Sequence, residues 1–201
     1  MSIKIYVEGG GDTRDLKLRC RRGFSEFLRK SGLEGRMPRI VACGGRQSAY
    51  DDFCTALKKA GGDEFIVLLV DSEDAVAAGG DGPWSHLKVR DNWDKPATAT
   101  DDNVHLMVWC MEAWFVADRE TLAAFFGQQF NANALPARED VENISKPDLY
   151  AGFENATRTC KKGKYGKGRH SFDILAQIDP AKVMAASPYA RRLINTLRVN
   201  A

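Results

Sequence analysis

Acidic residues stand at or shortly after the ends of apolar runs at three places in this sequence. Glu8 and Asp71 each follow or end such a run, and Glu112 comes shortly after a third. Glu73 lies two residues beyond Asp71, so an extended chain would point both carboxylates to one side, and Asp74 is adjacent. Crowded carboxylates repel one another unless a cation lies between them, and hard Mg²⁺ or Mn²⁺ prefers oxygen ligands. These acids therefore predict a divalent-metal site.

Each acid also has a purely structural interpretation. Asp74 suits the cap of the following segment, Glu112 suits the first turn of a helix, where its charge favours the dipole, and Glu8 suits a loop. The metal interpretation requires that the three positions meet. In a parallel sheet they do, because the carboxyl ends of its strands lie at one edge, where ligands bind.

Basic residues gather in a second group, between residues 161 and 170. Lysines and an arginine are interleaved there with glycines and a tyrosine. Such cations neutralise phosphates, an aromatic ring stacks on an unpaired base, and glycines let a loop follow a nucleic-acid backbone. The predicted phosphate or nucleic-acid contacts in this segment are Lys161, Lys162, Lys164, Tyr165, Lys167 and Arg169. A solvated surface loop has a similar composition.

Two glycine segments provide further candidate phosphate contacts. Gly10 lies within three consecutive glycines before an expected helix, where a backbone can approach a phosphate closely. Arg46 follows two glycines after the second apolar run, and it would either clamp a phosphate in the same crevice or lie in solvent. The sequence contains neither a P-loop nor a G-x-G-x-x-G motif, so ATP hydrolysis and dinucleotide binding have no support.

The elements that would position these residues follow from hydrophobic patterning. Apolar runs predict strands at residues 3–7, 38–43, 65–70 and 104–109. Helical periodicity follows the first two runs, and a further helix over residues 112–126 is expected to break or bend near Asp118. Strands that alternate with helices form right-handed βαβ units with a parallel sheet. The predicted fold is therefore α/β and Rossmann-like, with a four-stranded, mainly parallel sheet flanked by helices.

The remaining segments are less regular. Residues 75–102 form a long, glycine- and proline-containing stretch that predicts an active-site flap or an irregular insertion. Helical segments at 148–159 and 172–197 enclose the basic loop. We expect a core at residues 1–127 and a helical C-terminal extension at 128–201, which carries the basic loop and packs on the core as one domain.

The amino-acid composition indicates a globular protein and argues against several other classes. A chain of 201 residues with 44% hydrophobic and 28% charged residues is typical of one globular domain. It shows no apolar run near the roughly 18–20 residues that cross a bilayer and no signal-peptide stretch, so we expect a cytoplasmic protein without a membrane partner. The five cysteines lack C-x-x-C spacing, which argues against a disulfide framework and a zinc knuckle. The net charge of +2 neither requires nor excludes a polyanionic partner.

Two short motifs carry a resemblance to a known group of proteins. YVEGGGD at residues 6–12 and LVDSED at residues 69–74 resemble the two acidic motifs of TOPRIM domains, the metal-binding module of topoisomerases, primases and some nucleases. From about residue 4 to 197 the chain also resembles a TOPRIM-like family catalogued as domain of unknown function 4276. That similarity includes the segments CGGR at 43–46, MEAWF at 111–115, KYGK at 164–167 and SP at 187–188. Relatives of this family occur in anti-phage defence, where one acts as a nuclease toxin on host tRNA.

The resemblance implies particular roles for the acids. Glu8 corresponds to the glutamate of the first TOPRIM motif, and Asp71 corresponds to the leading aspartate of the second. TOPRIM domains usually carry Asp-x-Asp in the second motif, whereas this chain has Asp71, Ser72 and Glu73 with Asp74 adjacent. The second ligand of that motif is therefore either Glu73 or Asp74.

The resemblance also implies a reaction. TOPRIM nucleases use further acids and a lysine around a second metal, roles that Glu112 and either Lys164 or Lys167 would fill. We predict hydrolysis of phosphodiester bonds in RNA, including tRNA, or in DNA, dependent on Mg²⁺ or Mn²⁺, with Glu8, Asp71 and Glu73 as metal ligands. A partner ATPase and a homodimer are further expectations. The alternatives are a non-catalytic or partner-regulated interaction module and a phosphotransferase acting on small nucleotides.

Overall fold

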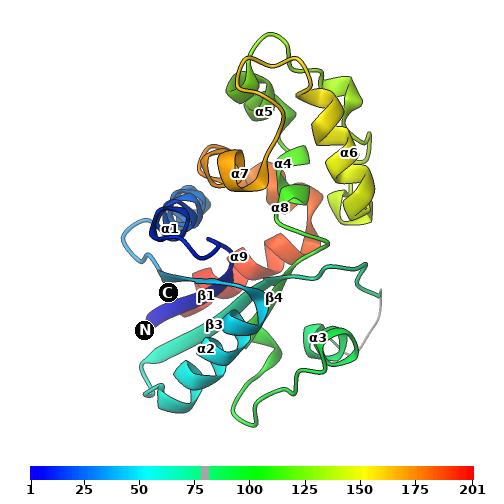
Figure 1. Ribbon diagram of the computed structural model, residues 1–201. Helices are drawn as coiled ribbons and strands as arrows, with labels where there is room; N and C mark the ends of the chain where they lie inside the picture. Colours follow the sequence, from blue (N-terminus) through cyan, green and yellow to red (C-terminus); the bar gives the residue numbers. More distant parts are fainter. Residues whose placement is uncertain (78–81) are drawn as a thin grey trace.

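The computed structural model describes residues 1–77 and 82–201. Within these residues, a single parallel sheet has the strand order β2-β1-β3-β4 (Figure 1). Its strands are β1 (Ser2–Glu8), β2 (Arg39–Gly44), β3 (Glu64–Asp71) and β4 (Val104–Met107). The predicted α/β fold with a four-stranded, mainly parallel sheet is therefore confirmed.

Two hydrophobic layers lie on either side of the sheet, and the central strand β3 contributes to both, with Leu69 in one and Leu68 in the other. Ile5 of β1 belongs to the cluster that contains Phe24 of α1 (Arg14–Leu28). Leu68 of β3 belongs to the cluster that contains Phe53 of α2 (Arg46–Lys59). Helix α1 covers one face of the sheet and α2 covers the other (Figure 1). Burial on both faces explains why the run in β3 is apolar without alternation.

The segment predicted as a flap or an irregular insertion contains a helix, so that prediction was wrong in part. Helix α3 (Pro83–Asp91) lies on the connection from β3 to β4 and buries Trp84 and Leu87 in the α2-side cluster. Proline at its first position and Asn92 in the left-handed conformation at its end are ordinary helix boundaries. Residues 78–81 of the predicted segment lie outside the described residues.

The break predicted near Asp118 is confirmed. Helix α4 (Glu112–Val116) ends just before this residue, and α5 (Arg119–Phe126) begins just after it. The Asp118 carboxylate accepts a hydrogen bond from the Thr121 backbone N–H at 3.3 Å, as an N-cap does. The side chain therefore separates two short helices by satisfying the free backbone donors of the second.

The C-terminal region contains more helices than the sequence indicated. Its helices are α6 (Lys146–Ala156), α7 (Lys167–Leu175), α8 (Pro180–Ala186) and α9 (Pro188–Asn200). Asp179 and Ser187 cap α8 and α9, so the single helical segment expected at 172–197 is divided. Helix α7 also begins inside the predicted basic loop, which places Lys167 at the first turn of a helix.

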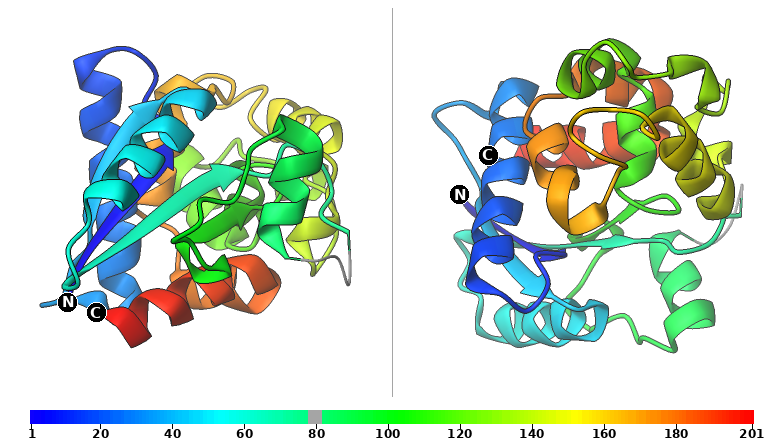
Figure 2. Two further views of the ribbon diagram at one scale, coloured as in Figure 1. Left: turned by 90° about the horizontal axis from the view of Figure 1, so that it is seen from below. Right: turned by 45° about the horizontal axis from the view of Figure 1, so that its top comes forward.

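The C-terminal helices contact the sheet and its neighbouring helices directly. Helix α7 packs along α1, and α9 runs beside the edge strand β4, where the Arg192 side chain donates a hydrogen bond to the Val104 carbonyl at 3.0 Å (Figure 2). One hydrophobic cluster includes Ile5 of β1 together with Ile174 of α7 and Leu193 of α9. The two predicted segments of the domain thus share a core, although the boundary at residue 127 stays a prediction. None of the described helices is both long and apolar enough to span a bilayer.

Candidate metal and phosphate site

Three carboxylates meet at the carboxyl edge of the sheet. Glu8 is the last residue of β1, Asp71 is the last residue of the adjacent strand β3, and Glu73 lies two residues further along the chain. One oxygen from each lies within 4.8 Å of the others. We call Glu8, Asp71 and Glu73 the carboxylate cluster. Its residues come together because neighbouring parallel strands end at the same edge.

The backbone after β3 is held in an unusual conformation that places Glu73. Its φ angle of 65° lies in the left-handed region, which is uncommon for a residue with a side chain. The Glu73 N–H donates to the Trp109 carbonyl at 3.0 Å, and the Trp109 N–H donates to the Ser72 hydroxyl oxygen at 2.7 Å. These bonds continue the pairing of β3 and β4 beyond the sheet. The turn that carries Glu73 is therefore fixed by the neighbouring strand.

Arg46 fixes Glu8 in the cluster. Its guanidinium donates to Glu8 Oε2 at 3.0 Å and also contacts the Asp71 carbonyl oxygen. The same group donates to both carboxylate oxygens of Asp91, at 2.8 and 2.6 Å, and lies 5.0 Å from the centre of the Trp93 ring. Arg46 lies near the predicted crevice, but its donors are bound by carboxylates of the chain. In this structure it orients Glu8 and joins α2 to α3.

Asp71 lies in an environment that opposes its ionisation. The side chain is 3% exposed, and its Oδ1 accepts a hydrogen bond from the Met111 N–H at 2.9 Å. Burial raises the pKa of Asp71 to about 7; nearby Lys167 counteracts this rise, and the negative charges of Glu8 and Glu112 add to it. Burial also raises the pKa of Glu8, although Arg46 opposes that rise. The carboxylates of the cluster are thus crowded, and a cation between them would relieve their mutual repulsion.

Glu112 lies beside the cluster and is completely buried. The Tyr165 hydroxyl donates to Glu112 Oε1 at 2.9 Å, whereas Oε2 has no hydrogen-bond partner among the described residues. Lys167 Nζ lies 3.8 Å from that Oε2 and 3.5 Å from Asp71 Oδ2. Glu112 is not one of the three residues whose oxygens meet within 4.8 Å. Among the described residues, the cation near Glu112 is the ammonium group of Lys167.

We predicted that Tyr165 stacks on a nucleic-acid base, but in the structure its side chain packs against other residues of the chain. Its ring stacks on Phe153 with 4.7 Å between the ring centres, and its hydroxyl is bound to Glu112. Both interactions turn the side chain toward the interior, because the ring packs on α6 and the hydroxyl supplies a donor to a buried carboxylate. A basic segment with one tyrosine has the same sequence pattern whether the ring is packed inside the protein or exposed for stacking. The sequence therefore could not distinguish these two arrangements.

Lys146 belongs to the site although sequence reasoning missed it. It is the first residue of α6, and its ammonium group pairs with Glu73 Oε2. Ser145 and Pro147 are a local sequence signal for the start of a helix. No local pattern marks a pairing with a residue 73 positions earlier in the chain.

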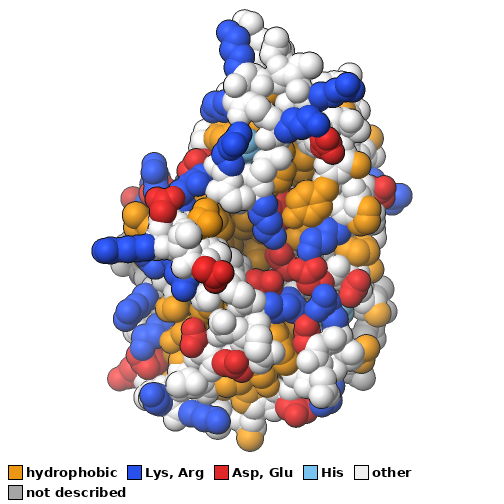
Figure 3. Space-filling view, in the orientation of Figure 1, with side chains coloured by type: hydrophobic (Ala, Val, Ile, Leu, Met, Phe, Trp, Pro, Cys, Tyr) orange, Lys and Arg blue, Asp and Glu red, His pale blue; other side chains and the backbone are white. Residues whose placement is uncertain are grey.

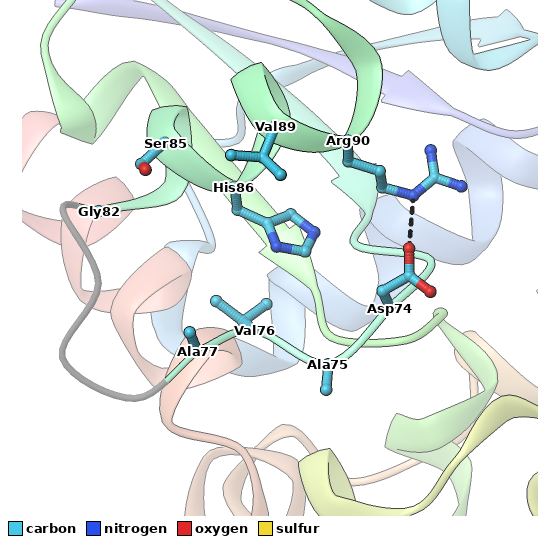
Figure 4. A pocket seen from close by; sticks show the side chains of 9 residues that line it. All are labelled: Asp74, Ala75, Val76, Ala77, Gly82, Ser85, His86, Val89 and Arg90. Carbon is cyan, nitrogen blue, oxygen red and sulfur yellow. Dashed lines mark hydrogen bonds and ion pairs between the residues drawn. The ribbon is translucent and has the colours of Figure 1, made fainter.

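Two predicted site residues lie away from the cluster. Asp74 is 66% exposed at its side chain and pairs with Arg90 of α3 at 3.2 Å, beside a separate pocket (Figure 4). Because Glu73 turns through the left-handed conformation, the side chain of the next residue is directed elsewhere. Lys164 pairs with Glu154 of α6 at 2.6 Å, and both side chains are more than half exposed. The structure therefore brings Lys167, and not Lys164, to the carboxylates.

The other predicted phosphate contacts of the basic segment lie on the surface. Lys161 and Arg169 are exposed, and the Lys162 ammonium group lies 3.8 Å from the centre of the Phe125 ring. Acidic and basic side chains lie close together near the middle of the face shown in Figure 3, below α7 in this orientation. The cations that contact the cluster are Arg46, Lys146 and Lys167, and no contact of Lys161, Lys162 or Arg169 with it is found among the described residues.

A cavity of about 270 Å³ opens onto the cluster. Its lining includes Gly10, Gly11, Gly44, Asp71 and Lys167. Gly10 has a φ of 87°, and a Cβ at this position would lie 3.0 Å from the Cα of α1 residue Lys17. A Cβ on Gly44 would lie 2.8 Å from the Gly11 carbonyl oxygen. Glycine is therefore required where the backbone passes between the sheet and α1, and this part of the cavity wall is bare backbone.

The donor set fits a hard divalent cation. Carboxylate oxygens are the ligands that Mg²⁺ and Mn²⁺ prefer, and such ions usually bind few protein carboxylates together with water or phosphate oxygens. The hydrogen bonds that Glu8 accepts from described residues reach Oε2, which leaves Oε1 for a ligand. Glycine backbone and the Lys167 side chain also lie beside this cluster, and both are groups that can contact a phosphate.

Fold and site together define an α/β protein with a carboxylate cluster and a glycine-lined cavity at the carboxyl edge of a parallel sheet. The chain belongs to the family described as Domain of unknown function (DUF4276), which matches residues 7–198. No curated protein and no solved structure matches it. The predicted membership in this family of unknown function is therefore confirmed, and the relationship to TOPRIM domains stays a prediction.

Proposed function

We propose that this chain binds Mg²⁺ or Mn²⁺ through Glu8, Asp71 and Glu73 and hydrolyses phosphodiester bonds of RNA or DNA. The carboxylate cluster is the observation that carries the proposal, because its oxygens approach within 4.8 Å at the place in the fold where ligands bind. Lys167 and the glycine-lined cavity beside the cluster supply the features that a phosphate group needs.

The residues of the chain have separate tasks in this proposal. Glu8, Asp71 and Glu73 would hold a divalent cation, which would supply Lewis acidity toward water and the phosphoryl oxygens. Glu8 and Asp71 hold the cation from two strands, and Arg46 keeps Glu8 in place. Lys167 neutralises the phosphate, and the backbone of the glycine segment lets it approach closely. In this proposal water is the attacking nucleophile, so that no covalent intermediate forms on the chain.

The broader role is proposed from the sequence resemblance. A TOPRIM-like nuclease related to anti-phage defence proteins would act in the cytoplasm as a toxin on tRNA, another RNA or DNA. A partner ATPase and a homodimer are the protein partners that belong to this proposal. The two acidic motifs support this role, because the structure contains both of their leading acids, Glu8 and Asp71, in one cluster.

A nuclease assay with matched variants tests the reaction. Labelled tRNA, single-stranded DNA and duplex DNA are incubated with the purified chain and Mn²⁺ or a chelator. We expect cleavage that needs the metal, is lost in Glu8→Gln and Asp71→Asn, and persists in Asp74→Asn. Asp74 is the matched control because its carboxylate pairs with Arg90 outside the cluster.

The lysines provide a second comparison in the same assay. We expect Lys167→Ala to reduce cleavage more than Lys164→Ala, because Lys164 pairs with Glu154 away from the cluster. Cleavage that resists the chelator, or that is equal in wild type and Asp71→Asn, contradicts the proposal. Metal binding without cleavage of any nucleic acid favours the interaction module, and turnover of mononucleotides alone favours the phosphotransferase.

A further inference from the structure

Lys167 lies between a member of the carboxylate cluster and a second, completely buried carboxylate. Its Nζ is 3.5 Å from Asp71 Oδ2 and 3.8 Å from Glu112 Oε2. Asp71 therefore faces two cation positions. One is shared with Glu8 and Glu73, and the other is shared with Glu112.

The second position requires a positive charge. Glu112 has no exposed surface, and its Oε2 has no hydrogen-bond partner among the described residues. The Tyr165 hydroxyl satisfies only Oε1. Burying a carboxylate without compensation is costly, so a cation must stay near Oε2 while Glu112 is ionised. In the described part of the chain, the ammonium group of Lys167 is the cation that lies within 4 Å of Glu112 Oε2.

The backbone of Lys167 is firmly placed even though its side chain is 53% exposed. Lys167 is the first residue of α7, and α7 is pressed against α1 at Gly23, where a Cβ would lie 2.8 Å from the Phe172 carbonyl oxygen. The ammonium group is thus tethered close to both carboxylates. A dissolved ion must displace a group that has a high effective concentration at this position.

We infer that the ammonium group of Lys167 occupies the position of a second cation, so that the site binds one divalent ion and not two. Sites with two metals place them about 3.5–4 Å apart around shared ligands. Asp71 is such a ligand here, but its Oδ2 faces the lysine. This inference rests on the proposed function, because the first position is the metal site proposed there.

The number of Mn²⁺ ions bound per chain tests the inference. Equilibrium dialysis at saturating Mn²⁺ should give one ion for the wild type and two for Lys167→Ala, because removal of the ammonium group leaves Asp71 and Glu112 without a cation. The double variant Lys167→Ala/Glu112→Gln should return to one ion. Lys164→Ala, a matched lysine substitution outside the cluster, should also bind one.

The outcomes separate this inference from the proposed function. Two ions bound to the wild type, or one ion bound to Lys167→Ala at saturation, overturns the inference while the metal site stands. No ion bound to the wild type overturns the proposed metal site and this inference with it. Lys167→Met removes the charge and retains the aliphatic chain, so it replaces the alanine variant if that variant does not fold. The electron paramagnetic resonance spectrum of bound Mn²⁺ gives an independent measure, since two neighbouring ions couple magnetically and one does not.

Discussion

Replacing Asp71 by asparagine should stabilise the metal-free protein at neutral pH. Asp71 is buried beside Glu8 and Glu112, and burial raises its pKa to about 7 from an ordinary value of 3.8. The folded chain therefore binds this proton more tightly than the unfolded chain does. As a result, the free energy of unfolding should fall as the pH rises from about 4 to about 7. Asparagine retains an oxygen that can accept the Met111 hydrogen bond and carries no charge.

The size of the effect follows from the width of this pH window. The interval from 3.8 to about 7 spans about three pH units. Each unit corresponds to about 1.4 kcal/mol, so ionisation of Asp71 lowers the free energy of unfolding by up to about 4 kcal/mol. The pKa of about 7 already includes the attraction between Asp71 and Lys167, which opposes the effect of burial. Above pH 7 we expect Asp71→Asn to exceed the wild type by about 1–4 kcal/mol.

Urea denaturation between pH 4 and pH 8.5 in the presence of a chelator measures the effect. The two proteins should have similar stability near pH 4 and should diverge as the pH rises. Mn²⁺ added at pH 7.5 should stabilise the wild type and leave Asp71→Asn unchanged. Asp74→Asn, which affects an exposed ion pair, should change stability by less than about 1 kcal/mol. Parallel curves for wild type and Asp71→Asn across the pH range would refute the reasoning.

Two further substitutions test how the elements around the site are packed. Tyr165→Phe should lower the free energy of unfolding by about 1–3 kcal/mol in thermal or urea denaturation, because it removes a donor from buried Glu112. Tyr50→Phe, which removes a hydrogen bond at the surface, should cost less, and equal losses would contradict the reasoning. Gly23→Ala should destabilise the protein by about 1–3 kcal/mol, because its Cβ would lie 2.8 Å from a backbone oxygen of α7. Gly61→Ala, with no atom within 4 Å of its Cβ, is the control, and a neutral Gly23→Ala would show that the helices separate easily.

The sheet could be predicted because its strands carry strong local signals. The apolar run of β3 and the acids at the ends of β1 and β3 indicated a parallel sheet with Glu8 and Asp71 at one edge. Helix α3 was missed because its nine residues lie in a stretch rich in glycine and proline, which masks a short helix. The division between α8 and α9 was missed because the Ser187 cap interrupts an otherwise continuous apolar pattern.

The site was only partly predictable, since its remaining residues depend on tertiary contacts. Glu73 and Asp74 are equivalent acids in the sequence, and the left-handed conformation of Glu73 separates them in space. Lys164 and Lys167 are likewise equivalent in a basic segment, and the start of α7 places one of them against Asp71. Lys146 reaches the site from α6, and its local sequence contains no sign of that contact.

The turn after β3 is ordered before any ligand arrives. Ser72 and Glu73 are tied to the chain around Trp109 by hydrogen bonds, so Glu73 reaches its left-handed conformation when the protein folds. Fixing the backbone of one residue costs about 1–2 kcal/mol of conformational entropy, and a left-handed residue adds about 1–2 kcal/mol of strain. A ligand that binds a preorganised site does not have to supply this free energy itself. If Glu73 binds the proposed cation, position 73 thus lowers the stability of the folded chain in return for higher affinity toward that ion.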